Sequence, residues 1–154
     1  MIIKIISIGN KLNSWELDSI NYYLKQIPKN LKIDFINLKS QQNPNYSESE
    51  VIIKESKLIM SKISKDDFVV AFDINGDQMS SKKFSNLIFD CFKTSKVLTF
   101  VIGGSFGLSS EIKDNSNRVL SASLFTFPHR LFRLILIEQI YRAHTIKNNM
   151  PYHK

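Results

Sequence analysis

Short and almost wholly apolar runs alternate along this chain with longer segments in which apolar residues recur every three or four positions. Runs of the first kind are typical of buried β-strands, and the second spacing places apolar side chains on one face of an α-helix. The pattern predicts strands over residues 2–8, 31–38, 67–73, 97–102 and 118–121. It predicts helices over 14–27, 47–63, 80–92 and 129–145, with a short helix beginning at 109 or 110.

Strands and helices therefore alternate through the whole length of 154 residues, without an internal repeat or a linker. Several strands are apolar throughout, as expected when helices cover both faces of a parallel sheet. The prediction is one α/β domain over residues 1–154, in which a parallel-rich sheet is flanked by helices.

Local signals sharpen some of these elements. Ser47 and Glu50 have the spacing of a capping box that opens a helix. The residues Asn75-Gly76-Asp77 are typical of a turn, so the third strand is expected to end at residue 73. The inward face of the first helix is expected to hold Leu17, Ile20, Leu24 and Ile27.

The chain carries 21 Lys and Arg against 14 Asp and Glu, a formal net charge of +7. This excess attracts polyanions such as RNA or DNA, although a lysine-rich surface kept for solubility explains it equally well. The single cysteine, Cys91, excludes an internal disulfide and lies in an apolar run, so we expect it to be buried. The apolar N-terminus is too short for a signal peptide or a membrane span, so a cytoplasmic protein is expected.

Three segments directly follow predicted strands: residues 72–76, 102–107 and 122–128. Open α/β sheets bind ligands beyond the C-terminal ends of their strands, so these segments converge on one pocket if the three strands are neighbours. The glycine-rich segment 103–107 matches neither a P-loop nor the dinucleotide fingerprint, and a tight strand-to-helix turn explains it as well as a ligand does. In 125–128, Phe-Thr-Phe-Pro, the aromatic rings are expected to be buried, either as a core plug, which composition favours, or as an apolar wall for a flat base.

The last predicted helix has a broader apolar surface than one side of a small sheet requires, so it is either deeply buried or packed against a second subunit. Glu138 and Arg142 stand four residues apart and can pair on one helix face. The basic end of the chain, interleaved with Tyr141 and Tyr152, suits phosphate binding together with base stacking. For His153, simple exposure near the terminus is the ordinary explanation.

Four stretches carry a resemblance along the whole chain: 101–108 (Val-Ile-Gly-Gly-Ser-Phe-Gly-Leu), 126–129 (Thr-Phe-Pro-His), 137–143 (Ile-Glu-Gln-Ile-Tyr-Arg-Ala) and 151–154 (Pro-Tyr-His-Lys). In order, spacing and chain length the sequence resembles the ribosomal RNA large subunit methyltransferase H family, which belongs to the SPOUT class. Each motif is weak alone, whereas the set is highly specific.

The resemblance implies that the C-terminal part of the sheet threads through a loop into a deep trefoil knot, a rare feature in proteins. It further implies a homodimer without metal, S-adenosyl-L-methionine as the cofactor bound in the knot, and N3-methylation of a pseudouridine in 23S ribosomal RNA of assembled ribosomes. The position of Phe72 is often Leu in relatives, and 123–125 vary, so backbone groups are expected to do most of the cofactor reading. Carried over by position, the cofactor contacts fall on Phe72, Gly103, Ala122, Ser123, Leu124, Phe125, Thr126 and Phe127.

The same resemblance implies where chemistry and RNA binding take place. His153 or Glu138 would remove the proton from N3, Arg142 would orient a phosphate or pair with Glu138, and Tyr152 would stack beside the target base. The candidate catalytic residues are therefore His153, Glu138, Arg142 and Tyr152. The candidate RNA-binding residues are His129, Arg130, Arg133, Arg142, Tyr152 and His153.

Two other functions remain open at this stage. A non-catalytic factor that binds RNA or the ribosome on the same fold would show the same charge and tail. A flavin or nucleotide oxidoreductase would use a similar sheet. Binding of S-adenosyl-L-methionine distinguishes the first alternative, and a colourless protein that does not bind nicotinamide cofactors would exclude the second.

Overall fold

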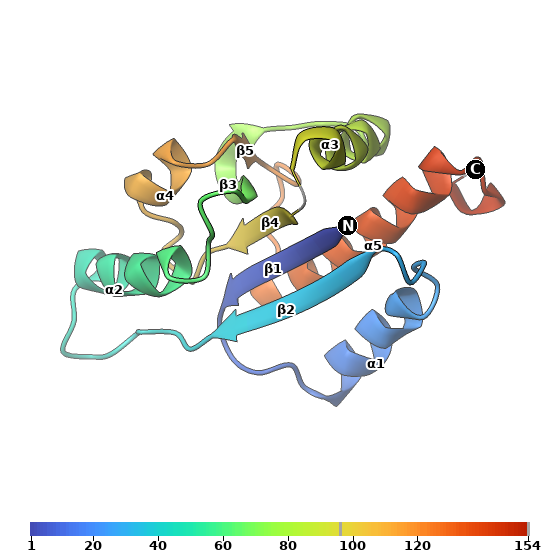
Figure 1. Cartoon of the computed structure of the whole chain (residues 1–154). Coiled ribbons are helices and arrows are strands. Elements are labelled where there is room, and N and C mark those ends of the chain that lie inside the picture. The colour runs from blue at the N-terminus through green and yellow to red at the C-terminus, as the bar shows by residue number, and fades with distance from the viewer. Residues whose placement is uncertain (96, 154) are drawn as a thin grey trace.

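A computed structural model describes residues 1–95 and 97–153, with the side chains of 1–95 and 97–152. Strands and helices alternate along the chain, as the sequence predicts (Figure 1). In chain order the elements are β1 (Ile2–Ile8), α1 (Ser14–Leu24), β2 (Lys32–Leu38), α2 (Glu48–Met60), β3 (Phe68–Asp77), α3 (Ser81–Thr94), β4 (Val97–Ile102), α4 (Ser110–Asp114), β5 (Arg118–Leu120), α5 (His129–Lys147) and the 3-10 helix η1 (Pro151–His153).

The strands form one sheet in the order β2-β1-β4-β3-β5, and all the pairings are parallel. Phe72 of β3 is in register with Ile102 of β4 on one side and with Leu120 of β5 on the other. The strands that precede the three candidate loops are therefore neighbours, and their C-terminal ends lie at the same edge of the sheet. This is the arrangement that convergence of the loops requires.

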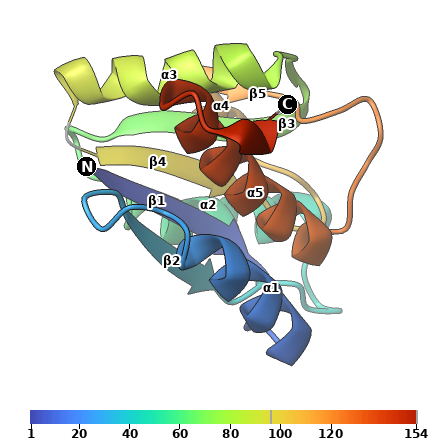
Figure 2. The same cartoon turned by 90° about the vertical axis from the view of Figure 1, so that its right-hand side faces the viewer.

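Helices cover both faces of the sheet: α1, α3 and α5 lie on one face, and α2 and α4 on the other (Figure 2). Successive strand side chains point to opposite faces, which is why strands that are apolar at every position serve two cores. Ile3 and Phe100 belong to the core under α1, α3 and α5. Ile6 and Val101 belong to the core under α2 and α4.

Helix α5 is the longest element, with 19 residues, and it packs between α1 and α3 (Figure 2). Its residues Leu136, Ile137 and Ile140 are buried in the larger core. Residues 121–128 lead to it from β5, which is the edge strand beside β3. Neither α5 nor another helix in the described part of the chain is long and apolar enough to cross a membrane.

The predicted turn at 75–77 is wrong, because β3 continues to Asp77. The strand pairs again with β5 through Asp77 and Leu120 after an irregularity that begins at Phe72. Gly76 makes this close passage possible, since a Cβ atom at that position would lie 2.5 Å from the carbonyl carbon of Leu120. The glycine therefore serves a close approach between two strands.

Two predictions about side-chain burial have different outcomes. Cys91 is buried, as expected, and desolvation raises the pKa of its thiol to about 11. Leu17, which was expected to point inward from the first helix, is 43% exposed, whereas Ile20 and Ile27 are buried. Helix α1 ends at Leu24, so the inward face of this segment is shorter than its periodicity indicated.

Both early helices begin with a capping box. The expected box of Ser47 and Glu50 is confirmed at the start of α2. A second box opens α1, where the Asn13 side chain accepts from the Glu16 amide at 3.2 Å and the Glu16 carboxylate accepts from the Asn13 amide at 3.1 Å. The box of α1 fixes both the start of the helix and the position of a buried carboxylate.

We predict that Asn13→Ala lowers the free energy of unfolding by about 1 kcal/mol, because the amide of Glu16 loses its capping acceptor. Urea denaturation measures the change. Ser14→Ala is the matched control, because Ser14 is exposed and adjacent. Equal stability of the Asn13→Ala and Ser14→Ala variants would contradict the capping role.

Candidate functional site

The last part of β3, from Phe72 to Asn75, and the loops that follow β4 and β5 line one cavity of about 580 Å³. A volume of this size is typical of sites for small molecules and cofactors. The cavity lies at the C-terminal edge of the sheet, where parallel α/β sheets bind ligands. The lining residues that the sequence singled out are Phe72, Gly103, Ala122, Ser123, Phe125, Thr126, Phe127 and His129, whereas Leu124 is not among the lining residues.

The glycine-rich loop is both a tight turn and a wall of the cavity. Its turn is closed by a hydrogen bond from the Gly107 amide to the Gly104 carbonyl at 3.0 Å, and Gly107 has a φ of 80°, which favours glycine. A Cβ atom on Gly103 would lie 2.9 Å from the backbone of Gly107. Any side chain at residue 103 would therefore displace the loop that forms the wall.

Behind this loop lies a buried carboxylate that sequence reasoning missed. Glu55 of α2 is 3% exposed, and its Oε1 accepts from the Ser40 hydroxyl at 3.1 Å and the Gln41 amide at 3.0 Å. Its Oε2 would lie 2.6 Å from a Cβ atom on Gly104. Glu55 thus ties the loop after β2 to the glycine-rich loop, and the absence of a side chain at Gly104 makes room for it.

An ion pair also lies in the cavity wall, where Asp73 and Lys113 are 3.3 Å apart. Asp73 ends the predicted third strand and also accepts a hydrogen bond from the Asn75 amide at 2.9 Å. The pair connects β3 to α4, two elements that the sequence did not bring together. The sequence does contain a sign of this pair, because the acidic residue Asp73 follows an apolar run. Asp73 lay within the candidate segment 72–76, but it was not named as a site residue.

The expectation that both aromatic rings of 125–128 are buried is wrong for Phe125, which is 81% exposed. Leu124 is 91% exposed, and Phe127 is half-buried in the cavity wall. The backbone turns outward here because the Ser123 hydroxyl accepts the Phe125 amide at 3.0 Å. Of the two interpretations of the segment, the core plug fails for Phe125, and the apolar wall fits Phe127.

His129, the first residue of α5, is half-buried and lines the cavity. Burial of the imidazole lowers its pKa below the ordinary value of 6.5, and the positive charge of Arg133 lowers it further, while the carboxylate of Glu55 partly opposes the shift. The ring is therefore neutral at pH 7.

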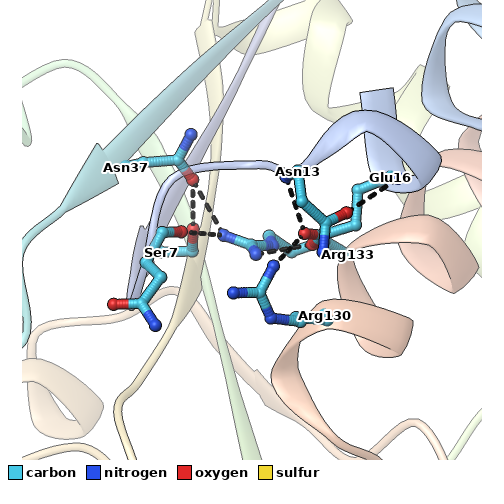
Figure 3. Close-up of polar contacts among 7 residues, drawn as sticks. Ser7, Asn13, Glu16, Asn37, Arg130 and Arg133 are labelled. Carbon is cyan, nitrogen blue, oxygen red and sulfur yellow. Dashed lines mark hydrogen bonds and ion pairs between the residues drawn. The ribbon is translucent and has the colours of Figure 1, made fainter. Parts of the chain in front are cut away.

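Arg133 was expected to contact RNA, and the structure contradicts a direct contact, because this residue is only 2% exposed. Its guanidinium is paired with the buried carboxylate of Glu16 at 2.6 Å (Figure 3). Arg130, one turn earlier on α5, contacts the same carboxylate but has a side chain that is 38% exposed. The expectation for Arg130 is therefore compatible with its position.

Glu138, Arg142 and Tyr152 form one cluster near the C-terminal end of α5. The predicted pairing of Glu138 with Arg142 is present at 2.6 Å, and the Tyr152 hydroxyl donates to Glu138 at 3.0 Å. Gln139 donates to the other carboxylate oxygen at 2.7 Å. Burial, together with the contact to Glu138, raises the pKa of Tyr152, so its hydroxyl stays protonated. The side chain of His153 lies outside the described residues.

The cavity and this cluster do not meet within one chain. Arg142 follows His129 by more than three helical turns, about 20 Å along the axis. A second hollow of about 340 Å³ lies between α3 and α5 and reaches Gln139, but Glu138, Arg142 and Tyr152 line neither hollow. Two groups of residues that the sequence assigned to one site therefore occupy opposite parts of α5.

Comparison with known proteins gives a match over the full length. A family model described as a predicted SPOUT methyltransferase matches residues 1–153. Curated proteins from Bacillus cytotoxicus, Clostridium tetani and Streptococcus thermophilus are 44%, 43% and 38% identical over 160, 159 and 159 aligned residues. Each alignment covers the whole of both chains, and each of these proteins is named ribosomal RNA large subunit methyltransferase H.

The parallel sheet, with its ligand-sized cavity at the C-terminal edge, and the matching model define the class, and the chain belongs to the SPOUT methyltransferase family. Within that class, identity over the full length places it in the ribosomal RNA large subunit methyltransferase H family, as the four motifs indicated.

We predict that the imidazole of His129 titrates below pH 6.5, because burial penalises its charged form. The unfolded chain then binds the proton more strongly than the folded chain, so stability falls as pH drops from 6.5 through the lower folded-state pKa. NMR titration measures the midpoint, and His129→Gln assigns the signal. Urea denaturation should show that His129→Gln loses less stability than the unsubstituted protein over this range. A midpoint at or above 6.5 would contradict the assignment.

Proposed function

We propose that this protein is an S-adenosyl-L-methionine-dependent methyltransferase that acts on N3 of a pseudouridine in 23S ribosomal RNA, in assembled ribosomes of the cytoplasm. The observation that carries the proposal is the convergence of three loops on one cavity, in a chain that matches ribosomal RNA methyltransferases from end to end. The net charge of +7 supports an RNA substrate.

The cavity fits the cofactor in size and in the character of its walls. Gly103 lets the loop that forms one wall close against Gly107, and Phe72 and Phe127 offer apolar surfaces to a flat ring. Residues 122, 123 and 125–127 line the cavity, and recognition through their backbone groups would tolerate variation of their side chains. The bound cofactor supplies a methyl group that is already activated by the sulfonium. The protein must then align the target nitrogen with that methyl group and accept its proton.

We further propose that residues 121–128 are threaded through the chain as a deep trefoil knot. The path from the edge strand β5 back to α5, between α1 and α3, supports this proposal (Figure 2). Threading would hold the three cavity loops together at one place.

We propose that the functional unit is a homodimer in which each cavity is completed by the partner. Three large apolar side chains, Ile74 in β3 and Leu124 and Phe125 in the loop after β5, are 73%, 91% and 81% exposed in or beside the cavity wall. Such exposure in adjacent segments is typical of an interface. A second copy that covers them would also bring its Glu138–Arg142–Tyr152 cluster to a cavity that lacks these groups in its own chain.

Within the cluster, the roles follow from the hydrogen bonds of Glu138. Its carboxylate accepts from Arg142 and Tyr152 through one oxygen and from Gln139 through the other. Glu138 therefore organises Arg142 and Tyr152. We assign phosphate contact to Arg142, stacking beside the target base to Tyr152, and acceptance of the N3 proton to His153.

We predict that ribosomal RNA from a strain without this protein lacks the methyl group at the target pseudouridine, as mass mapping would show. The unsubstituted gene should restore it, and Gly103→Ala should not, because the new Cβ atom displaces the cavity wall.

Calorimetry should show at least tenfold weaker binding of S-adenosyl-L-methionine by the Gly103→Ala variant, about 1.4 kcal/mol. Ser110→Ala is the control, because Ser110 is exposed, follows the same loop and is not among the residues that line the cavity. RNA that remains methylated without the protein would refute the function, and binding without methylation would favour a non-catalytic factor.

The shared site predicts complementation between two inactive variants. Gly103→Ala disables the cavity and Arg142→Ala disables the cluster, so a mixed dimer of the two has one intact site. After equal mixing, about a quarter of the original activity should return, since about half of the dimers are mixed and each has one of two sites. Single-turnover methylation measures the recovery. Activity that stays at the level of the separate variants would show that each chain uses its own cluster.

A further inference from the structure

Two arginines of α5 share one buried carboxylate. Glu16 of α1 is 0% exposed, and its Oε1 accepts from Arg133 Nη2 at 2.6 Å. Its Oε2 accepts from Arg130 Nη1 and from the Asn13 amide (Figure 3). Burial by itself would raise the pKa of Glu16, but these hydrogen bonds and the arginine charges lower it, so the carboxylate stays charged.

Arg133 is fixed from several directions. Besides Glu16, its Nη1 donates to the Asn10 carbonyl at 3.2 Å and to Asn37 Oδ1 at 3.1 Å. Asn37 in turn accepts from the Ser7 hydroxyl at 2.9 Å (Figure 3). The ends of β1 and β2 and the first turn of α1 thus hold the guanidinium in the interior, where the charge of Arg133 neutralises that of Glu16.

The second arginine then carries a charge that nothing in the cluster balances. One carboxylate and two guanidinium groups leave one positive charge, and the exposed member is Arg130. Among the residues that the structure describes, its guanidinium bonds only to Glu16, through Nη1. Arg130 directly follows His129, which lines the cavity. A cation held in a defined position is therefore present on the first turn of α5, which begins at the cavity wall.

We propose that Glu16 is a positioning residue that holds Arg130 so that its remaining N–H groups receive a phosphate of the substrate RNA. The inference rests on the proposed function, because it names the substrate group that this rim binds. Arginine presents a planar fork that matches two phosphate oxygens, which lysine does not. Holding the long side chain in place beforehand removes part of the entropy cost of binding, worth up to about tenfold in affinity.

Ribosomes from a strain that lacks the protein are the probe, and binding is measured over a series of salt concentrations. Arg130→Ala should weaken binding about tenfold and reduce the slope of log affinity against log salt by about one. Arg118→Ala is the matched control: it removes the same charge from an exposed residue that begins β5, at the opposite edge of the sheet. Its salt slope should stay that of the unsubstituted protein.

Two further variants separate position from charge. Arg130→Lys keeps the charge and leaves the pair of Glu16 with Arg133 untouched, yet most of the tenfold loss should remain. Glu16→Asp also keeps the charge but withdraws the carboxylate from Arg130 by one methylene. This variant should raise the KM for ribosomes without changing kcat. The double variant, Glu16→Asp with Arg130→Ala, should bind ribosomes no more weakly than Arg130→Ala alone.

Three results would overturn the proposal: Arg130→Ala that behaves like Arg118→Ala, Arg130→Lys that binds like the unsubstituted protein, or additive effects in the double variant. If thermal unfolding shows that Glu16→Asp does not fold, the two Arg130 variants decide. Cofactor affinity should stay within about twofold in all variants, since no cavity loop changes. An unsubstituted protein that binds ribosomes but neither binds the cofactor nor methylates would refute the proposed function alone, because the salt slopes still test Arg130.

Discussion

The parallel direction of every strand is the constraint on which the site depends. Because all the pairings in the sheet are parallel, each strand delivers its following loop to the same edge. Because β4, β3 and β5 are neighbours, the loops after Phe72, Ile102 and Leu120 have to meet there. The cavity thus follows from the strand order, and its walls then depend on glycines that allow the backbone to come close.

Helix α5 connects this edge to the other half of the proposed chemistry. Its first residue, His129, lines the cavity, whereas Glu138 and Arg142 stand two to four turns further along. A rigid helix cannot bring both of its ends to one place, so a single chain separates the cavity from the cluster. The proposed two-fold pairing of chains would resolve this separation, because a self-complementary contact repeats itself and would complete both sites at once.

The hydrophobic pattern was sufficient for the order of elements, because that order depends on local periodicity. Convergence of the three segments also required β3, β4 and β5 to be neighbours, which the pattern left open and the sheet order establishes. The pattern was insufficient where the outcome depends on distant partners. Gly76 was expected to lie in a turn, although it lacks a side chain because the backbone of Leu120 passes close to it. Phe125 read as buried, although no part of the described chain covers it. Arg133 was expected to contact RNA, because nothing local indicates its partner Glu16, which is more than a hundred residues away in the sequence.

The buried pair of Glu16 and Arg133 is poorly explained by stability alone. Removing two charges from water costs several kcal/mol, and apolar residues of the same volume would stabilise such a position about as well. An apolar pair would, however, place no constraint on direction. A carboxylate that is fully buried and bonded on both oxygens fixes where α1 meets α5, and so fixes the first turn of α5 beside the cavity. The ion pair therefore makes structural sense as a device of alignment, because it fixes the direction of the first turn of α5 and of Arg130 on that turn.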